Sequence, residues 1–284
     1  MKRTVAHISD LHFGRIDPMV VEALVEDLTE QKPSLAIISG DLTQRARRGQ
    51  FEDARAFLDR LTMPYMVIPG NHDIPNFNLF GRFTDPYRNY KRYISEDLCP
   101  VHQDDDLVVV GVNTVRPWIL DFAEGRISRS QIKNMHRTLR DAGPERFKIF
   151  FTHHPFLPPP DAPETTLVGR ARLALRRLED AGVDLMLAGH LHKAYNGDIM
   201  SHHTKVARSI LVAQASTATS TRLRNEPNAY NFITIDGHGD DATVTFLVRS
   251  WEGARFTPGL RSSYVKKKDR WELQAQDPGL RPLA

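Results

Sequence analysis

The stretch TVAHISDLH, residues 4–12, joins a short apolar run to an aspartate and a histidine. A short apolar run of this kind predicts a buried strand over residues 4–9. Residues two apart on an extended chain point the same way, so Asp10 and His12 are expected to share one direction. The first element of the predicted fold is therefore a strand whose carboxyl end carries polar side chains.

The segments that follow alternate between helix and strand patterns. Apolar residues at helical spacing predict helices over 18–31 and 50–61, and compact apolar runs predict strands over 35–39 and 65–68. This strand–helix–strand–helix–strand order predicts a mainly parallel sheet with helices on its faces. The expected fold class is therefore α/β.

The rest of the 284-residue chain suits one large domain with added pieces. Further strands are expected over 107–112, 148–152 and 185–188, and helices over 128–140 and 167–181. Three later segments are expected to form strands of a second sheet: 210–213, 231–235 and 243–249. We place one domain over 1–250, with a loop or small helical insertion at about 75–105, and a C-terminal extension over 251–284 that wraps or is mobile.

Polar residues gather at one kind of place, the downstream end of a predicted strand. Five strand ends carry them: Asp10 and His12; Asp41; Asn71, His72 and Asp73; His153 and His154; His190 and His192. Because sites in open α/β sheets form outside the carboxyl ends of the strands, these ends are expected to build one site. Carboxylate, imidazole and amide oxygen without thiolate favour Zn, Fe, Mn or Co over an Fe–S cluster or Cu(I).

Each motif has an ordinary structural explanation when it is taken alone. An Asp-x-His pair or a His-x-His pair is commonly a surface feature, and Asn-His-Asp after Pro-Gly is a typical turn. Their order along one chain, each at a strand end, is what makes the set specific. The sequence therefore predicts a metal site built from the whole set.

Charge and composition narrow the class of partner. A formal net charge of +3 fits an anionic substrate, and the chain has no stripe of interleaved aromatics and arginines typical of nucleic-acid binders. Cys99 is the one cysteine, which excludes an intrachain disulfide and fits a reducing compartment. Neither a signal-type apolar region nor an apolar run of roughly 20 residues is present, so we expect a cytoplasmic protein without membrane insertion.

The set D-x-H, G-D, G-N-H-D, H and G-H-x-H resembles the calcineurin-like metallophosphoesterase family. Within it, GDLTQRARRGQF, SRSQIKNM and FTHHP are most similar to bacterial class III cyclic-nucleotide phosphodiesterases and related glycerophosphodiesterases. The resemblance covers about residues 4–195 by motif and extends to about 250 by strand pattern. It implies a four-layer α/β/β/α sandwich and two metal ions about 3.5 Å apart. Fe and Mn are the metals expected first, and Zn or Co are the alternatives.

The resemblance also implies a role for each residue. The first metal would take Asp10, His12, Asp41 and His192. The second would take Asp41, Asn71, His153 and His190, with Asp41 as the bridge. His72 is the implied catalytic acid, which protonates the departing alkoxide. Asp73 would orient a histidine or cap its turn, and His154 would face substrate, support a ligand or have a structural role only.

The implied function is hydrolysis of a small anionic phosphodiester by a metal-bridging hydroxide. A 3′,5′-cyclic nucleotide is the first expected substrate, and a glycerophosphodiester or another small diester is the nearest alternative. A nuclease, a lipid-linked pyrophosphate hydrolase and a non-enzymatic scaffold of the same fold are further alternatives. Metal identity and assembly into a homo-oligomer stay open.

Overall fold

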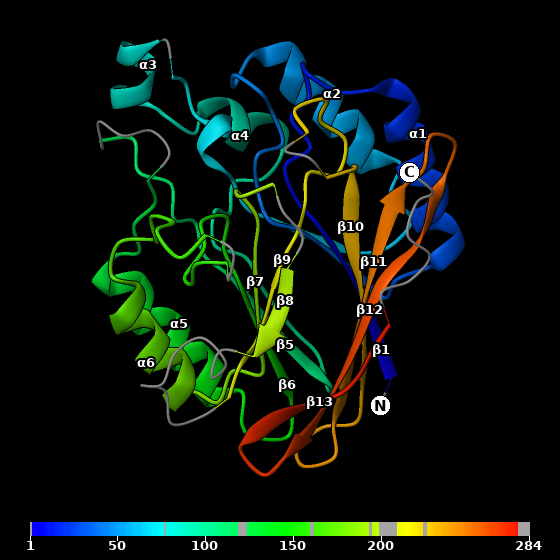
Figure 1. The fold of residues 1–284 in the computed structure, drawn as a ribbon. Coiled ribbons are helices and arrows are strands. Elements are labelled where there is room, and N and C mark those ends of the chain that lie inside the picture. The colour runs from blue at the N-terminus through cyan, green and yellow to red at the C-terminus, as the bar shows by residue number, and fades with distance from the viewer. Residues whose placement is uncertain are drawn as a thin grey trace.

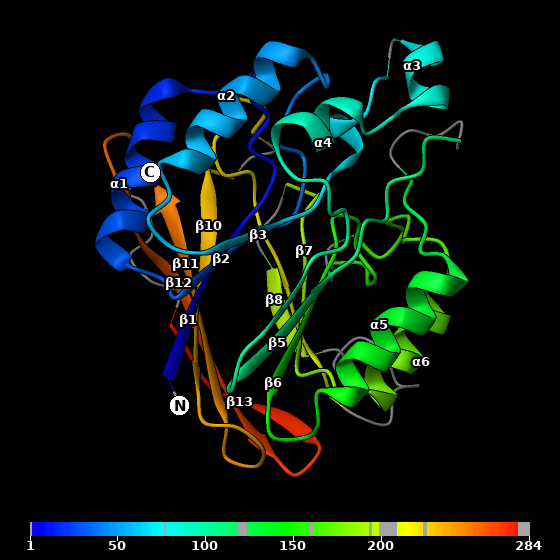
Figure 2. The same cartoon turned by 180° about the vertical axis from the view of Figure 1, so that it is seen from behind.

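Two β-sheets pack face to face, and helices cover their outer faces (Figure 1). The computed structural model describes residues 2–76, 78–118, 124–159, 162–192, 195–198, 209–223 and 226–277. The view from behind shows α1 and α2 beside one sheet and α5 and α6 beside the other (Figure 2). The arrangement is the expected four-layer α/β/β/α sandwich.

The first sheet has seven strands in the order β13-β12-β11-β10-β1-β2-β3. Its parallel part consists of β1 (Lys2–Ile8), β2 (Leu35–Ile38) and β3 (Tyr65–Val67). Its antiparallel part consists of β10 (Ala229–Asp236), β11 (Thr243–Trp251), β12 (Phe256–Lys267) and β13 (Arg270–Asp277). The helices α1 (Pro18–Gln31) and α2 (Arg48–Asp59) connect the parallel strands.

The second sheet has six strands in the order β4-β5-β6-β7-β9-β8. Four are parallel: β5 (Leu107–Gly111), β6 (Phe147–Phe151), β7 (Leu185–Ala188) and β9 (Leu211–Gln214). The edges are β4 (Val101–Gln103) and β8 (Tyr195–Asp198). The helices α5 (Arg129–Asp141) and α6 (Ala171–Asp180) cover this sheet.

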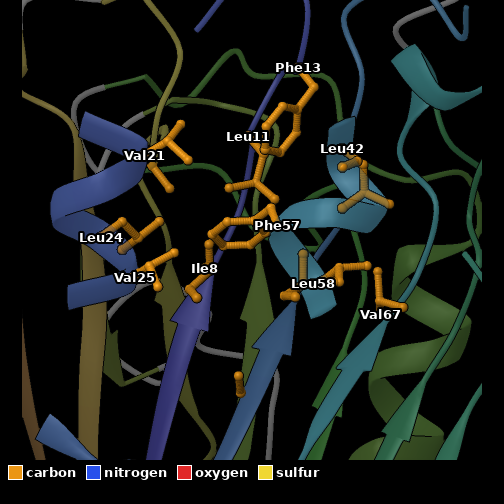
Figure 3. Close-up of a cluster of buried hydrophobic side chains, with 14 of the residues drawn as sticks. Ile8, Leu11, Phe13, Val21, Leu24, Val25, Leu42, Phe57, Leu58 and Val67 are labelled. Carbon is orange, nitrogen blue, oxygen red and sulfur yellow. The ribbon is translucent and has the colours of Figure 1, made fainter. Parts of the chain in front are cut away.

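Alternation along the strands separates the layers of the core. Ile8 of β1 and Ile38 of β2 face the helices, whereas Val5 and Ile37 face the second sheet. In the helix-facing cluster, α1 and α2 bring Leu24 and other apolar side chains against Ile8 and Leu11 (Figure 3). Since Leu11 is fully buried between Asp10 and His12, apolar packing fixes the loop that carries both polar residues.

The predicted grouping of the late strands is wrong. Segments 210–213, 231–235 and 243–249 do not form a sheet of their own, because β9 pairs in parallel with β7 while β10 pairs antiparallel with β1. The apolar pattern of a strand reports its burial and not its partner. These strands therefore divide between the two sheets.

Two segments of irregular composition have regular structure. The predicted insertion at 75–105 contains α3 (Leu79–Thr84), α4 (Arg88–Tyr93) and β4, with residue 77 outside the described part. The chain after Trp251 forms β12 and β13 in the first sheet, and residues 278–284 lie outside the described part. A domain boundary at residue 250 stays a prediction, although β11 continues through residue 250 and pairs with β12 in one sheet.

Candidate metal centre

The loops after β1, β2, β3, β6 and β7 bring all ten predicted site residues to one end of the sandwich. Nine of these residues contact at least one other member of the set. The tenth, Asp73, supports the loops between them. Six of the ligating side chains are buried, and His190 is partly exposed. Residues as far apart in the sequence as Asp10 and His192 therefore meet in one place.

The first group of ligand atoms is formed by three side chains. Nε2 of His12 lies 3.3 Å from Nε2 of His192. Oδ1 of Asp10 lies 3.6 Å from Nε2 of His12 and 3.3 Å from Nε2 of His192. One carboxylate oxygen and two imidazole nitrogens thus face a common point.

The second group lies beside the first and contains an amide oxygen. Oδ1 of Asn71 lies 3.0 Å from Nε2 of His153 and 3.1 Å from Nδ1 of His190. The two imidazole nitrogens are 3.3 Å apart. Nδ1 of His153 donates a hydrogen bond of 2.8 Å to the backbone oxygen of Ser39, which turns its Nε2 towards the group.

Asp41 lies between the two groups. Its Oδ2 is 3.8 Å from Nε2 of His12 and 3.4 Å from Nε2 of His153. Its other oxygen accepts a hydrogen bond of 2.8 Å from the backbone N–H of His72. Gly70 makes this approach feasible, because a Cβ at that position would lie 2.2 Å from Oδ1 of Asp41. One oxygen atom is therefore placed to serve both groups.

The chemistry of these residues fits metal ions. Oδ1 of Asp10 is buried and accepts no hydrogen bond within the described part of the chain, a costly state for a carboxylate without a cation. Burial opposes ionisation of Asp41, but His153 and His72 outweigh it and hold the pKa of that carboxyl well below its usual range. Burial likewise lowers the pKa of His153, but Asp41 raises it to about 9 overall. The centre therefore attracts positive charge.

The backbone at the site is strained. Five of the predicted ligands have positive φ although none is glycine: Asp10 (54°), His12 (54°), Asp41 (54°), His190 (75°) and His192 (57°). Such residues are uncommon in the left-handed region and persist where surrounding structure imposes them. Asp10 and His12 were expected to share a direction because the chain is extended. They do converge, but through left-handed residues beyond the end of β1.

His72 borders the centre and is held from behind. Its Nδ1 donates a hydrogen bond of 2.9 Å to the backbone oxygen of Gln44, and its ring meets the ring of His12 edge-on at 4.9 Å between centroids. Nε2 of His72 is thereby left for proton exchange. The sequence reasoning missed Gln44, although it lies in the quoted GDLTQ block directly after Asp41.

Asp73 caps the turns that carry its neighbours. Its carboxylate accepts hydrogen bonds from the backbone N–H groups of Leu42, Thr43 and Gly70 at 3.1, 2.8 and 2.9 Å. Burial, followed by repulsion from Asp41, raises the pKa of Asp73 to about 6. Of the two roles considered from the sequence, this geometry supports the capping of the turn.

His154 is buried behind the second group. Its ring centroid lies 4.9 Å from that of His190 and 5.0 Å from that of His153. Nδ1 lies 2.7 Å from Oγ1 of Thr114, and Nε2 has no hydrogen-bond partner among the residues that the structure describes. Thr114 was not predicted, because no motif precedes it.

Fold and site together define a class: an α/β sandwich with a buried aspartate, histidine and asparagine centre suited to metal ions. The sequence matches the calcineurin-like phosphoesterase family over residues 3–194. The chain belongs to that family, which uses a dinuclear metal centre. Family and relatives support a metal-dependent phosphoester hydrolase.

Two curated relatives have informative names. The chain is 24% identical over 219 residues to a probable cyclic nucleotide phosphodiesterase of Synechococcus, an alignment that covers 69% of this chain and 75% of the relative. It is 27% identical over 165 residues to the glycerophosphodiester phosphodiesterase GpdQ of Enterobacter lignolyticus, covering 54% and 57%. The chain thus spans little more than half of the second relative.

Solved structures support the fold alone, because their sequence identity is low. A purple acid phosphatase from yellow lupin seeds superposes with a TM-score of 0.68 at 13% identity, over 95% of this chain and 54% of that one. GAP50, the anchor in the inner membrane complex of Plasmodium, gives a TM-score of 0.59 at 14% identity, over 95% and 91%. No helix in the described part of this chain is long and apolar enough to cross a membrane.

Proposed function

We propose that this chain is a phosphodiesterase with two metal ions that hydrolyses a small anionic phosphodiester. The observation that carries the proposal is the position of Asp41, whose Oδ2 lies within 3.8 Å of a ligand nitrogen from each group. A 3′,5′-cyclic nucleotide is the first candidate substrate, since a probable cyclic nucleotide phosphodiesterase is among the relatives. The likeness to GpdQ favours a glycerophosphodiester as the second.

The residues divide between two metal positions. Asp10, His12 and His192 would hold one ion, Asn71, His153 and His190 the other, and Asp41 would contact both. Two divalent ions bring four positive charges and the carboxylates of Asp10 and Asp41 return two, so the loaded centre attracts an anionic phosphodiester. Fe and Mn are the proposed metals, with Zn or Co as alternatives that suit the same donor set.

When bound, the ions would act as Lewis acids and supply a water of lowered pKa as the nucleophile. The chain's own contribution is positioning, because the backbone oxygen of Ser39 orients His153 and the backbone N–H of His72 holds Asp41. His72 is the proposed general acid. Its Nδ1–H is held by the backbone of Gln44, so Nε2 is the atom that gives a proton to the departing alkoxide.

A substrate panel with metal analysis tests this function. The metal-loaded protein is assayed with added Mn²⁺ on 3′,5′-cyclic AMP, a glycerophosphodiester and bis(4-nitrophenyl) phosphate. We expect turnover of at least one biological diester, and its loss in Asp41→Ala. Two bound metals without turnover of any diester would support the scaffold alternative.

A further inference from the structure

A small ladder of three chain segments adjoins His154. The N–H of Arg126 donates to the oxygen of Thr114 at 2.8 Å, and the N–H of Gly169 donates to the oxygen of Gly125 at 2.8 Å. The N–H of Val168 bonds the oxygen of Pro155, the residue after His154, at 3.0 Å. The ladder is therefore fixed to the same loop that carries the predicted ligand His153.

Each segment of the ladder contributes an arginine. Nε of Arg116 donates to the backbone oxygen of Arg126 at 2.8 Å, and Nη1 of Arg170 donates to that of Ile127 at 2.9 Å. The side chain of Arg126 lies over Gly169, where an added Cβ would be 3.0 Å from its Cγ. Burial lowers the pKa of Arg116, and the charges of Arg126 and Arg170 lower it further although Tyr87 opposes them. We call these three residues the arginine cluster.

Within the part of the chain that the structure describes, no carboxylate is paired with the arginine cluster. Its hydrogen bonds go to neutral acceptors, and no carboxylate of the described residues forms an ion pair with any of the three. Some exposed arginines elsewhere do have carboxylate partners, as Arg48 has Glu52 and Arg60 has Glu22. Isolated positive charges held close together favour an anionic ligand.

Two helix ends add to the positive potential. The ladder leads into α5 and α6, which run side by side in both views (Figure 1; Figure 2). Neither helix has an acidic residue in its first turn, and Arg129 and Arg172 stand there instead. Because the N-terminal end of a helix is itself positive, arginines are unfavourable at this position unless an anion offsets them.

The arginine cluster is close to the candidate metal centre. A Cβ on Gly125 would lie 2.4 Å from the ring of His154, so the backbone of the ladder touches that imidazole. The ring centroid of His154 in turn lies 4.9 Å from that of His190 of the second ligand group. Arg126 follows Gly125 directly, a Cα step of about 3.8 Å. One imidazole and one residue thus separate the arginine cluster from the second ligand group.

We infer that Arg116, Arg126 and Arg170 form a subsite for a second anionic group, a phosphate or a carboxylate, on the diester substrate. The assignment to substrate rests on the proposed phosphodiesterase function. The diester would bind at the metal centre while its second anionic group binds the guanidinium groups at the rim. The preferred substrate class is therefore a small phosphodiester with an additional negatively charged substituent.

The first experiment measures anion binding without turnover. The metal-loaded protein is heated in sodium sulfate and in sodium chloride of equal ionic strength, and the difference in Tm is compared between wild type and Arg126→Gln. Arg126 is exposed, and its side chain makes no hydrogen bond to the residues that the structure describes, so its replacement should not destabilise the fold. We expect a smaller sulfate effect in Arg126→Gln and an unchanged effect in the control Arg261→Gln, an exposed arginine of β12. Equal effects in all three proteins would overturn the subsite.

The second experiment assigns the subsite to substrate. The substrates are the 4-nitrophenyl ester of thymidine 5′-phosphate with and without a 3′-phosphate. In wild type we expect kcat/KM to be about tenfold higher with the extra phosphate, the size of one charge-assisted hydrogen bond. Arg126→Gln should lose this preference, Arg126→Lys should keep part of it, and the control Arg261→Gln should keep all of it.

The outcomes separate the two proposals. If both esters are hydrolysed equally well by wild type, the substrate subsite is wrong while the phosphodiesterase function stands. If neither these esters nor any diester of the substrate panel is hydrolysed by fully loaded protein, the proposed function is contradicted, and the sulfate comparison alone decides whether the arginine cluster binds anions.

Discussion

The backbone N–H of His72 donates a hydrogen bond of 2.8 Å to Oδ1 of Asp41, and this bond ties the candidate general acid to the candidate bridging ligand. The bond uses only the main chain of His72. The side chain of His72 can therefore be removed without loss of the support that Asp41 receives. Acid catalysis and metal binding become separable by mutation.

His72→Ala should keep both metal ions and lose about 10²–10⁴-fold in kcat, the usual contribution of a general acid. The loss should be largest for alkyl diesters and small for 4-nitrophenyl diesters, because a good leaving group departs without a proton. Metal content and kcat on both kinds of substrate are the measurements. Equal losses on the two leaving groups, or an empty metal centre, would contradict the role of His72.

The left-handed backbone at His12 should make glycine more stabilising there than alanine. A left-handed residue costs roughly 1–2 kcal/mol when it carries a Cβ, so metal-free His12→Gly should exceed His12→Ala in unfolding free energy by about that amount. Urea denaturation measures both. Asp53 of α2 is an exposed helical position, and there the alanine variant should be more stable than the glycine variant by about 1 kcal/mol. The same order at both positions would argue against strain at His12.

His7 should make the metal-free fold sensitive to acid. Burial lowers its pKa from 6.5 to about 3, with Asp10 opposing, and its Nε2 lies 3.0 Å from Oγ of Ser39. Below pH 6.5, His7 is protonated in the unfolded chain but stays neutral in the folded chain. The free energy of unfolding therefore falls as the pH falls from 6.5 towards 3. At pH 5 the loss should be about 2 kcal/mol relative to neutral pH.

His7→Gln should remove this part of the pH dependence. We compare the unfolding free energy of the variant with that of wild type at neutral pH and at pH 5. Relative to wild type, the variant should be about 2 kcal/mol more stable at pH 5 than it is at neutral pH. The control is His238→Gln, which replaces an exposed histidine after β10 and is measured at the same two pH values. A constant difference for His7→Gln would show that this histidine does not carry the acid sensitivity.

A buried ion pair joins α1 to the antiparallel part of the first sheet. Arg249 donates from Nε and Nη2 to the two oxygens of Asp27, each at 2.6 Å, and the Tyr230 hydroxyl donates to Oδ2 at 2.5 Å. Asp27→Leu or Arg249→Met alone should cost about 3–5 kcal/mol, because each leaves a buried charge unpaired. The double variant should cost clearly less than the sum, as measured by denaturant unfolding. Additive losses would mean that the two charges do not stabilise one another.

The sequence predicted the layers and the edge where the site lies. Compact apolar runs identified the parallel strands, period-3.6 patterns identified their helices, and the carboxyl ends of β1, β2, β3, β6 and β7 do meet. It could not predict that Asp10 and His12 converge through left-handed residues, since a residue type alone does not fix φ. It also could not assign β9 and β10 to different sheets, because pairing depends on long-range register.

Supporting residues were harder to predict than the motifs. Gln44 contacts His72 through its backbone oxygen, and Thr114 contacts His154 through its hydroxyl. Such groups occur throughout any sequence, so they give no local signal. The arginine cluster is likewise assembled from three segments that no local pattern connects. Such contacts become visible only when the tertiary structure brings distant segments together.

Metal stoichiometry in Asp41→Ala is the most direct test of the dinuclear centre. Wild type loaded with Mn²⁺ should bind two ions per chain, and Asn71→Ala should bind one, because its ligand belongs to the second group only. Asp41→Ala should bind fewer than one, provided that circular dichroism shows it folded, since both positions lose a ligand. Two ions retained by folded Asp41→Ala would contradict the bridging position of Asp41 and with it the proposed centre.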